Sequence, residues 1–425
     1  MREMKDGGVS WIGTVPSDWI RKKVKNVVSL IGSGTTPSSS CLRYYESEDV
    51  NWIQSGDIYG VDTIIKTNTM ISNVAVRSLS ALHVYNPDYI VVAMYGGSVG
   101  NIAISKIEAC VNQACCCIQT DNQNDLKFMY YWIYMCKSDF LRVSEGGGQP
   151  NISQAKIRNQ YYMQPPLAEQ HRIADFLDTK CAEIDALTAD IQAQIDTLEQ
   201  YKRSVITETV TKGLNPDAKM KDSGIQWIGN MPAHWDVIRG KYILRYMQKP
   251  VREDDGVITC FRDGEVTLRS NRREDGFTMS DKEIGYQGID VGDLVVHGMD
   301  GFAGSIGISN SRGKASPVLN VLDTDQCKRY IMYYLRSMAY SDVFLALATG
   351  IRVRSCDLRW NKLAELSYPV PPLDEQNAIV KHIDSVLSKA DAVIADKKAQ
   401  LATLDEYKKS LIFEYVTGKK EVPTS

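Results

Sequence analysis

Apolar residues between positions 165 and 213 recur at the spacing of a helix. No Pro or Gly interrupts the chain after Pro166 until Gly213. Seven positions separate successive members of the apolar series, which is Leu177, Ile184, Ile191, Leu198 and Val205. A sustained heptad repeat is typical of a long helix that packs along another helix. Roughly 40 residues at about 1.5 Å each give a rod of about 60 Å, which cannot bury its apolar stripe alone.

A second stretch with the same pattern begins at Pro371. The offset is 371 − 165 = 206, and it aligns the motif Pro-Pro-Leu-x-Glu-Gln in both stretches and Tyr201-Lys202 with Tyr407-Lys408. The alternative is two unrelated amphipathic helices, each packed on its own domain. Matching polar residues at one offset favour two copies that pack on each other. The apolar seam predicted for the second helix contains Ile383, Leu387, Ile394, Leu401, Leu404 and Leu411.

The remaining sequence is also repeated. Residues 4–19 read MKDGGVSWIGTVPSDW and residues 220–235 read MKDSGIQWIGNMPAHW, which we interpret as aromatic segments that dock the chain onto a domain. Residues 88–105 and 292–309 each read as an apolar strand, a Gly-rich turn and a second strand. An aromatic helix is expected after each, at 129–139 and 332–342.

These repeats predict an α+β protein of two similar halves. Two globular domains, made of short mixed strands and helices, are joined by two long antiparallel coiled-coil helices. The internal repeat is expected to be pseudo-twofold, with the chain termini adjacent. The predicted boundaries are 1–164 for the first globular domain, 165–213 for the first long helix, 214–370 for the second globular domain, and 371–425 for the second long helix and tail.

Composition narrows the function classes. The net charge of the 425 residues is −3, so nucleic-acid binding would depend on local patches. No run of about 18 apolar residues and no secretory leader pattern is present, so we expect a cytoplasmic protein without a membrane span. The ten cysteines include Cys115-Cys116-Cys117 but no CxxC pair. Neighbours on a strand point to opposite faces, so we expect reduced thiols and no metal site.

No catalytic constellation is predicted. Asn86-Pro87-Asp88-Tyr89 resembles the Asn-Pro-Pro-Tyr loop of amino-methyltransferases, but Asp replaces the second Pro and no Gly-rich cofactor loop precedes it. A turn before an apolar strand explains it better. Pro87-Asp88 and Pro216-Asp217 lack the Glu-x-Lys partner of a nuclease site, and the phosphate-loop motif is absent. We therefore expect no catalytic residues and no cofactor bound by this chain.

Hydroxyl, amide, aromatic and basic residues gather in the loops of both globular domains, and these types suit contacts to DNA phosphates and base edges. The first-domain candidates are Thr35, Thr36, Arg43, Tyr44, Gln54, Ser55, Ser98, Asn101, Gln149 and Asn151. The second-domain candidates are Arg262, Arg269, Arg272, Arg273, His297, Lys314, Arg352 and Arg354. The alternative is solvated loops, with Arg paired to the interleaved Asp263, Glu265, Glu274 and Asp275. For the cluster as a whole we favour DNA.

With the repeat laid out, nearly the whole chain resembles the specificity subunit of type I restriction-modification systems. The paired Trp-Ile-Gly-x-x-Pro-x-x-Trp segments and the two Pro-Pro-Leu-x-Glu-Gln motifs carry the resemblance. In the first half it also rests on Gly-Ser-Gly-Thr-Thr-Pro at 32–37, Trp-Ile-x-Ser-Gly-Asp-Ile at 52–58 and Gly-Gln-Pro-Asn-Ile-Ser at 148–153.

The resemblance implies that the two globular domains are target recognition domains, each reading half of a bipartite double-stranded DNA target. Because their front halves differ, the target is expected to be asymmetric. The helix pair would fix the spacing and dock two modification subunits, with Asp190, Gln194 and Glu199 as candidate docking residues. S-adenosylmethionine, ATP and Mg would belong to partners, namely the modification (methyltransferase) and restriction (translocase-nuclease) subunits. The alternatives are a self-contained DNA-modifying enzyme and a coiled-coil scaffold without a DNA role.

Overall fold

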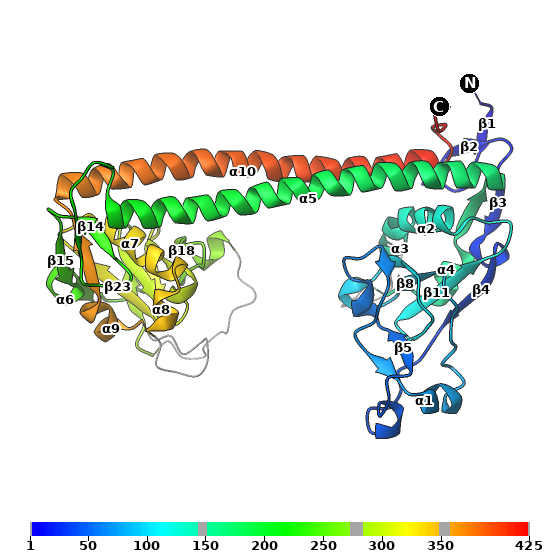
Figure 1. Cartoon of the computed structure of the whole chain (residues 1–425), viewed down its shortest axis with the longest axis horizontal. Coiled ribbons are helices and arrows are strands. Elements are labelled where there is room, and N and C mark those ends of the chain that lie inside the picture. Colours follow the sequence, from blue (N-terminus) through cyan, green and yellow to red (C-terminus); the bar gives the residue numbers. More distant parts are fainter. Residues whose placement is uncertain (1, 143–150, 273–283, 348–357, 424–425) are drawn as a thin grey trace. The chain divides into compact units, whose positions relative to one another are not determined.

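The computed structural model describes residues 2–142, 151–272, 284–347 and 358–423 (Figure 1). The chain divides into two compact units, here called unit 1 (Met1–Asp190 with Gln400–Ser425) and unit 2 (Ile191–Ala399). Two long helices, α5 (Leu167–Lys212) and α10 (Leu373–Val416), each contribute one end to each unit. The predicted α+β class with two long helices is confirmed. The domain boundaries drawn from the sequence stay a prediction, because this division cuts through both helices.

The main sheet of unit 1 has the strand order β4-β11-β8-β9-β6. Its strands are β4 (Val28–Ser33), β11 (Cys115–Thr120), β8 (Tyr89–Ala93), β9 (Ile102–Ser105) and β6 (Thr63–Ile64). The cysteine run lies on the central strand β11 and is fully buried: Cys116 packs in one core and Cys115 and Cys117 in another. Burial raises the pKa of the Cys116 thiol to about 12, so the thiol stays protonated at neutral pH.

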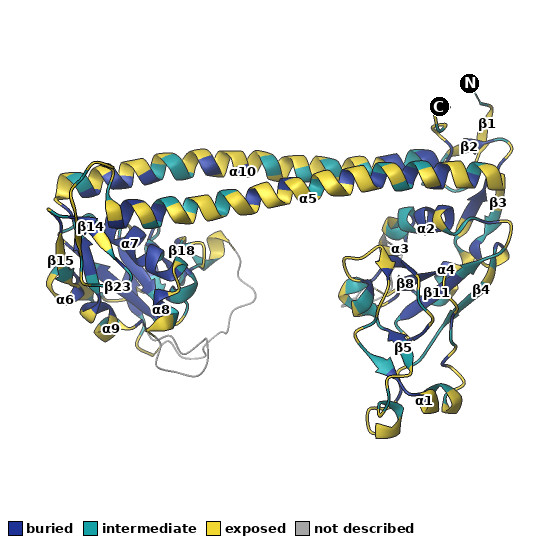
Figure 2. Cartoon of the chain, viewed as in Figure 1, coloured by how far each residue is buried: buried dark blue, intermediate teal, exposed yellow. Residues whose placement is uncertain are grey.

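Smaller elements surround this sheet. The strands are β1 (Met4–Asp6), β2 (Thr14–Pro16), β3 (Ile20–Lys23), β5 (Val50–Ile53), β7 (Met70–Ile71), β10 (Ala109–Val111) and β12 (Tyr161–Gln164). The helices are α1 (Asn73–Ser78), α2 (Leu126–Met135), α3 (Lys137–Arg142) and α4 (Gln154–Asn159). The predicted aromatic helix is α2, whose Phe128 and Trp132 share one core with Trp19 and with Leu177 and Leu411 of the long helices. Most of α2 is buried (Figure 2).

Unit 2 repeats this arrangement. Its sheet has the order β16-β23-β20-β21, which corresponds to β4-β11-β8-β9 of unit 1. The sheet strands are β16 (Arg245–Met247), β23 (Leu319–Asp323), β20 (Leu294–His297) and β21 (Ile306–Ile308). The other strands are β13 (Met220–Asp222), β14 (Asn230–Pro232), β15 (Asp236–Arg239), β17 (Ile258–Cys260), β18 (Val266–Leu268), β19 (Gln287–Ile289), β22 (Gly313–Ala315) and β24 (Ser367–Val370). The helices are α6 (Gly240–Ile243), α7 (Lys328–Tyr340), α8 (Val343–Ala346) and α9 (Trp360–Glu365). The predicted internal repeat is thereby confirmed.

A buried glutamine fixes the start of each long helix. Gln170 Oε1 accepts hydrogen bonds from the backbone N–H of Asp125 (2.9 Å) and from the Tyr162 hydroxyl (3.2 Å), while Nε2 donates to the carbonyl of Pro165 (2.9 Å). In unit 2, Gln376 accepts from the N–H of Cys327 (2.9 Å) and donates to the carbonyl of Pro371 (2.9 Å). Each glutamine thus ties its long helix to the beginning of the aromatic helix, α2 or α7. This bonding explains why Glu-Gln recurs in both motifs.

The aromatic segments contact the other ends of the long helices. Gly213 and Gly418 follow α5 and α10 in the left-handed region (φ +74° and +67°), which favours glycine. Gly213 lies against the ring of Trp235, and Gly418 lies against Trp19. Lys419 Nζ donates to the carbonyl of Ile12 (2.6 Å), so the C-terminal tail and the N-terminal segment meet in unit 1. The predicted adjacency of the termini is confirmed.

The seam of the helix pair is apolar and flanked by ion pairs. Lys408 of α10 bonds Asp185 of α5 (2.7 Å), and Lys202 of α5 bonds Asp391 of α10 (2.6 Å). The two ion pairs are equivalent in the repeat: Asp185 corresponds to Asp391 (185 + 206 = 391) and Lys202 corresponds to Lys408 (202 + 206 = 408). The buried seam residues are Leu177, Ile184, Ile191, Ile383, Ile394 and Leu411, and the half-buried ones are Leu198, Val205, Leu387, Leu401 and Leu404.

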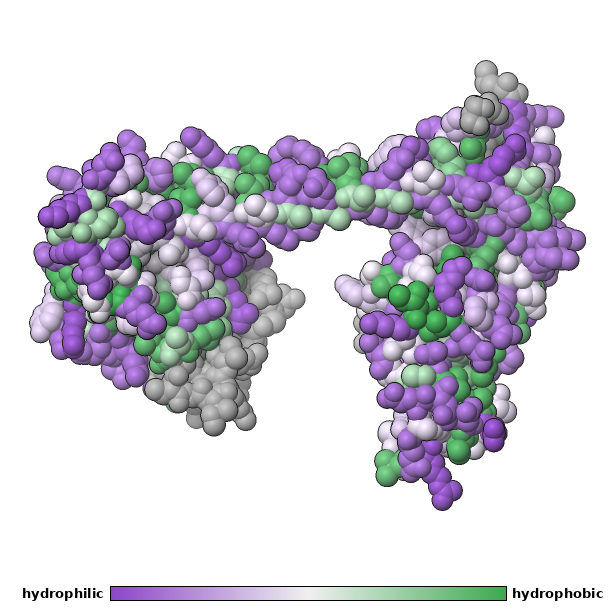
Figure 3. All heavy atoms as spheres, viewed as in Figure 1, coloured by the Kyte–Doolittle hydropathy of each residue, from purple (hydrophilic) through white to green (hydrophobic). Residues whose placement is uncertain are grey.

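Hydrophilic residues predominate on the face of the molecule in Figure 3. No helix in the described ranges combines the length and the apolar character needed to span a bilayer.

Replacing Gln170 by Leu should destabilise the protein by about 2 kcal/mol, because the N–H of Asp125 and the carbonyl of Pro165 lose a partner in a buried place. Chemical denaturation measures the loss as a lower midpoint. Gln192→Leu is the matched control, since Gln192 is exposed on the same helix. Equal midpoints for the two variants would show that the buried glutamine does not stabilise the helix start.

Candidate nucleic-acid interface

Several loops of unit 1 converge at one edge of its main sheet. The N–H of Asn112 donates to the carbonyl of Ile53 (3.0 Å), and the N–H of Met94 donates to the carbonyl of Ala114 (2.7 Å). The N–H of Ile152 in turn donates to the carbonyl of Met94 (2.9 Å). These bonds, together with the bond between Thr36 and Gln113, hold the loops after β4, β5 and β8, the loop before β11 and the segment at 151–152 together. We call this set the unit 1 loop group.

The unit 1 loop group carries most of the candidates predicted in the first half. Thr36 Oγ1 donates to Gln113 Oε1 (2.6 Å) within it, and Asn151 forms a backbone bridge with Tyr95. The loop group contains Thr35, Thr36, Gln54, Ser55, Ser98 and Asn151. Their DNA contacts stay a prediction.

Other candidates of unit 1 lie elsewhere or are already engaged. The backbone of Arg43 is held by Ser72 at the start of α1, and Tyr44 packs on the small core around Trp52. The Asn101 side chain accepts a hydrogen bond from Lys137 Nζ (2.9 Å). Gln149 lies outside the described residues.

Sequence reasoning missed Tyr95 and Lys137. Tyr95 is 40% exposed in the unit 1 loop group, and Lys137 lies beside the Gly-rich turn that precedes β9. Burial lowers the pKa of Lys137, and neighbouring Lys409 lowers it further. Tyr95 directly follows the apolar strand in the repeat, which is a signal that the strand-turn-strand pattern already contained.

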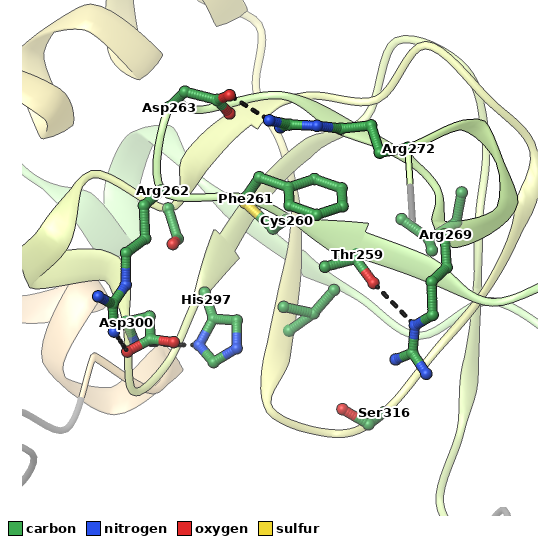
Figure 4. A pocket seen from close by; sticks show the side chains of 13 residues that line it. Thr259, Cys260, Phe261, Arg262, Asp263, Arg269, Arg272, His297, Asp300 and Ser316 are labelled. Atoms are coloured by element: carbon green, nitrogen blue, oxygen red, sulfur yellow. Dashed lines mark hydrogen bonds and ion pairs between the residues drawn. The ribbon is translucent and has the colours of Figure 1, made fainter. Parts of the chain in front are cut away.

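In unit 2 some of the predicted basic residues line one cavity of about 370 Å³ (Figure 4). Its walls come from β17, from the loops on either side of β18, from the end of β20 and the loop after it, and from the segment that leads into β23. We call it the unit 2 cavity. Among the candidates, Arg262, Arg269, Arg272 and His297 line it.

The arginines of the unit 2 cavity are held by neighbours. Arg272 pairs with Asp263 (2.8 Å) and Glu265 (3.3 Å), and its guanidinium lies 4.1 Å from the ring centre of Phe261. Arg262 pairs with Asp300 at 3.3 Å. The sequence left open the alternative that arginines pair with the carboxylates between them. Arg272 follows this alternative, because it pairs with Asp263 and Glu265.

Arg269 and Lys314 differ in position. Arg269 Nε donates to Thr259 Oγ1 at 3.3 Å on the cavity wall. Lys314 is half-buried on β22 and is not among the cavity residues. Arg273, Arg352 and Arg354 lie outside the described residues.

His297 at the end of β20 is fixed in one tautomer. Its Nδ1 accepts hydrogen bonds from the backbone N–H groups of Met299 (3.2 Å) and Asp300 (2.9 Å). A nitrogen that accepts two such bonds carries no proton, so the neutral ring is protonated at Nε2. Burial lowers the pKa of His297; the negative charge of Asp300 opposes this effect and the positive charge of Arg262 adds to it. The side chain is therefore neutral at pH 7 and presents an Nε2–H donor.

Comparison with known proteins finds similarity to type I restriction enzyme specificity subunits. A family model described as the type I restriction modification DNA specificity domain matches residues 16–197. The putative MjaX specificity subunit of Methanocaldococcus jannaschii is 23% identical, covering 97% of this chain and 96% of the relative. The StySPI specificity subunit of Salmonella potsdam is 21% identical over 96% of this chain and 90% of the relative. Over nearly its whole length the chain is therefore similar to type I restriction enzyme specificity subunits, and residues 16–197 match their DNA specificity domain.

The fold of this chain is also found in a solved structure. A chain from a structure titled for complex assembly and conformational transition of the type I R-M system matches 96% of this chain and 99% of its own length. Its TM-score is 0.68 at 15% identity. Among the relatives compared by sequence, the EcoKI specificity subunit of Escherichia coli strain K12 is also 22% identical over 96% of this chain and 90% of the relative.

Within the described residues, no three His, Cys, Asp or Glu side chains form a group able to hold a metal ion.

We expect His297 to titrate below the ordinary histidine value of about 6.5 and to carry its proton on Nε2 at pH 7. Protonation would place a hydrogen on Nδ1 against two backbone donors, so the neutral form persists until the pH falls below 6.5. Nitrogen-15 NMR of the histidine-labelled protein measures both properties, and His297→Gln assigns the signal. A midpoint at or above 6.5 would contradict this assignment.

Proposed function

We propose that this chain is the non-catalytic DNA sequence-specificity subunit of a type I restriction-modification complex. The observation that carries the proposal is that units 1 and 2 share one fold but carry different loops. The sheets share their strand order, and each long helix begins at an equivalent buried glutamine, Gln170 or Gln376. A fold that is kept while its loops differ suits a protein whose loops bind and whose scaffold positions them.

Each unit would read one half of an asymmetric, bipartite double-stranded DNA target. Unit 1 presents hydroxyl, amide and aromatic groups, among them Thr36, Tyr95 and Asn151. Unit 2 presents arginines and His297 around a cavity. Because these chemistries differ, the two half-sites are expected to differ in sequence. Each mismatched base pair costs about 1–3 kcal/mol, so two linked readers together discriminate far better than one.

The helix pair would set the gap between the half-sites and dock two modification subunits. Supporting this role, α5 runs without interruption from unit 1 into unit 2, and ion pairs at repeat-related positions fasten it to α10. The docking candidates are Asp190, Gln194 and Glu199. Glu199 also pairs with Lys202 at 3.1 Å, so its side chain has a partner within the helix.

The chemistry would belong to other subunits in the cytoplasm. Modification subunits would bring S-adenosylmethionine and methylate adenine, and restriction subunits would bring ATP and Mg for translocation and cleavage. Two features support this division: the named relatives are specificity subunits, and Asn86-Pro87-Asp88-Tyr89 departs from the methyltransferase motif. In the structure this segment is the turn before β8 that the sequence suggested, with Asp88 at φ +69°.

Methylome sequencing tests the proposal. Cells that carry this chain with its modification subunit should contain a methylated adenine motif of two unlike half-sites separated by a fixed gap. Deleting the chain should abolish the motif, because the modification subunit loses the surface that selects the sequence.

The control is a strain in which the modification subunit is catalytically inactive and this chain is intact; it should also lack the motif. If the motif persisted after deletion of the chain, the chain would not select the sequence and the scaffold alternative would replace the proposal. If the chain alone produced methylation, it would be a self-contained enzyme.

A further inference from the structure

Two polar atoms on the wall of the unit 2 cavity have no hydrogen-bond partner among the described residues. Ser305 is only 1% exposed, lines the cavity, and its Oγ is unpaired. His297 Nε2 is likewise without a partner, since both hydrogen bonds of the ring are made at Nδ1. Buried polar groups in folded proteins are nearly always paired. This expectation applies to Ser305 Oγ, whereas His297 is half-buried and adds a donor that no described residue uses. A buried unpaired hydroxyl beside an unused donor on one cavity wall indicates a ligand that bonds both.

The side chains of His297 and Arg269 can act only as hydrogen-bond donors toward the cavity. His297 Nε2 only donates, because the backbone of Met299 and Asp300 occupies the acceptor nitrogen. Arg269 contributes a guanidinium on the opposite side of the cavity, next to Thr259 (Figure 4). Guanidinium groups donate and never accept. The partner of this wall must consequently offer acceptors.

The charge of the cavity favours a neutral partner over a phosphate. Two carboxylates, Asp263 and Asp300, line it together with the arginines that they bind, Arg272 at 2.8 Å and Arg262 at 3.3 Å. Each of these positive charges is thus balanced locally, and the carboxylates would repel an additional anion. The ring of Phe261 and the side chain of Leu319 add apolar wall, which suits the edge of a base better than a phosphate.

The same positions in unit 1 lack this arrangement. At the offset of 204 that aligns the strand-turn-strand segments, Ala93 corresponds to His297 and Asn101 to Ser305. The Asn101 side chain is already bonded by Lys137 at 2.9 Å. The shared scaffold therefore does not require the donor at His297 Nε2. A residue that determines sequence specificity is expected to differ between the two units in this way.

We infer that the unit 2 cavity reads the acceptor edge of a guanine, with His297 Nε2–H as a fixed donor to N7 or O6. In the major groove guanine presents two acceptors, N7 and O6, whereas adenine presents one acceptor and one donor. A wall of donors thus selects guanine. This inference rests on the proposed function and names one base of the half-site that unit 2 reads.

Two substitutions of His297 separate its two nitrogens. His297→Asn keeps an acceptor at the position of Nδ1 for the backbone N–H groups but removes the Nε2–H donor. His297→Gln keeps a donor near the position of Nε2 but loses the Nδ1 acceptor. A purely structural role would make the Gln variant the more damaging one. A reading role makes the Asn variant the one that changes the sequence recognised.

The experiment uses the complex of this chain with its modification subunit. In the methylome, His297→Asn should relax one guanine of one half-site while the other half-site stays unchanged, and His297→Gln should retain that guanine. In binding assays, replacing that guanine by 7-deazaguanine should weaken the wild-type complex by about tenfold if His297 bonds N7, and replacing it by 6-thioguanine, which still pairs with cytosine, should weaken the complex if His297 bonds O6. The corresponding replacement should have little effect on the Asn variant. Equal thermal midpoints for wild type and variant control for folding.

Three results would overturn the inference. One is an unchanged motif in a folded Asn variant. Another is a uniform loss of affinity for all sequences with a shallower salt dependence, which indicates a phosphate contact. The third is a wild-type complex that responds to neither replacement at any guanine of the target, which decides the matter even if the variants do not fold. A wild-type chain that directs no methylated motif would instead refute the proposed function itself.

Discussion

The seam between the two long helices is the constraint on which the rest of this molecule depends. Neither α5 nor α10 can bury its apolar stripe alone, and full burial of a residue such as Leu177 or Ile383 is worth about 1.5–3 kcal/mol. Each unit therefore includes one end of both helices. The first and last parts of the chain are thereby brought together in unit 1, where Lys419 bonds the backbone of Ile12.

The seam also separates residues that build the scaffold from the loop residues that we propose read DNA. Building residues are repeated: the buried glutamines Gln170 and Gln376 hold the starts of the long helices, and Trp19 and Trp235 lie against the glycines at their ends. The loop residues are not repeated. Tyr95 and Asn151 meet in unit 1, whereas unit 2 has His297 and its arginines around a cavity. Such a division lets recognition change without loss of the core.

The parts that the sequence predicted are those that depend on local periodicity. Heptads and the offset of 206 gave the long helices, and the strand-turn-strand repeats gave β8-β9 and β20-β21, because burial imposes a period on the residues themselves. The candidate site was less predictable. Spacing allowed Arg272 to face either DNA or Asp263, and only the folded loop pairs it with Asp263 and Phe261. Likewise the tautomer of His297 follows from two backbone N–H groups of a turn, a geometry that no residue pattern signals. Arg43 and Tyr44 lie outside the unit 1 loop group for a similar reason, since contacts with α1 and Trp52 decide their place.

The central claim is that each unit reads its own half of the target on a shared scaffold. It is tested most directly by replacing residues 236–370 with the equivalent block of a relative whose target is known, and then sequencing the methylome. The account predicts that one half-site changes to that of the relative while the other half-site stays the same. If methylation continued and both half-sites changed, or neither did, independent reading by the two units would be contradicted.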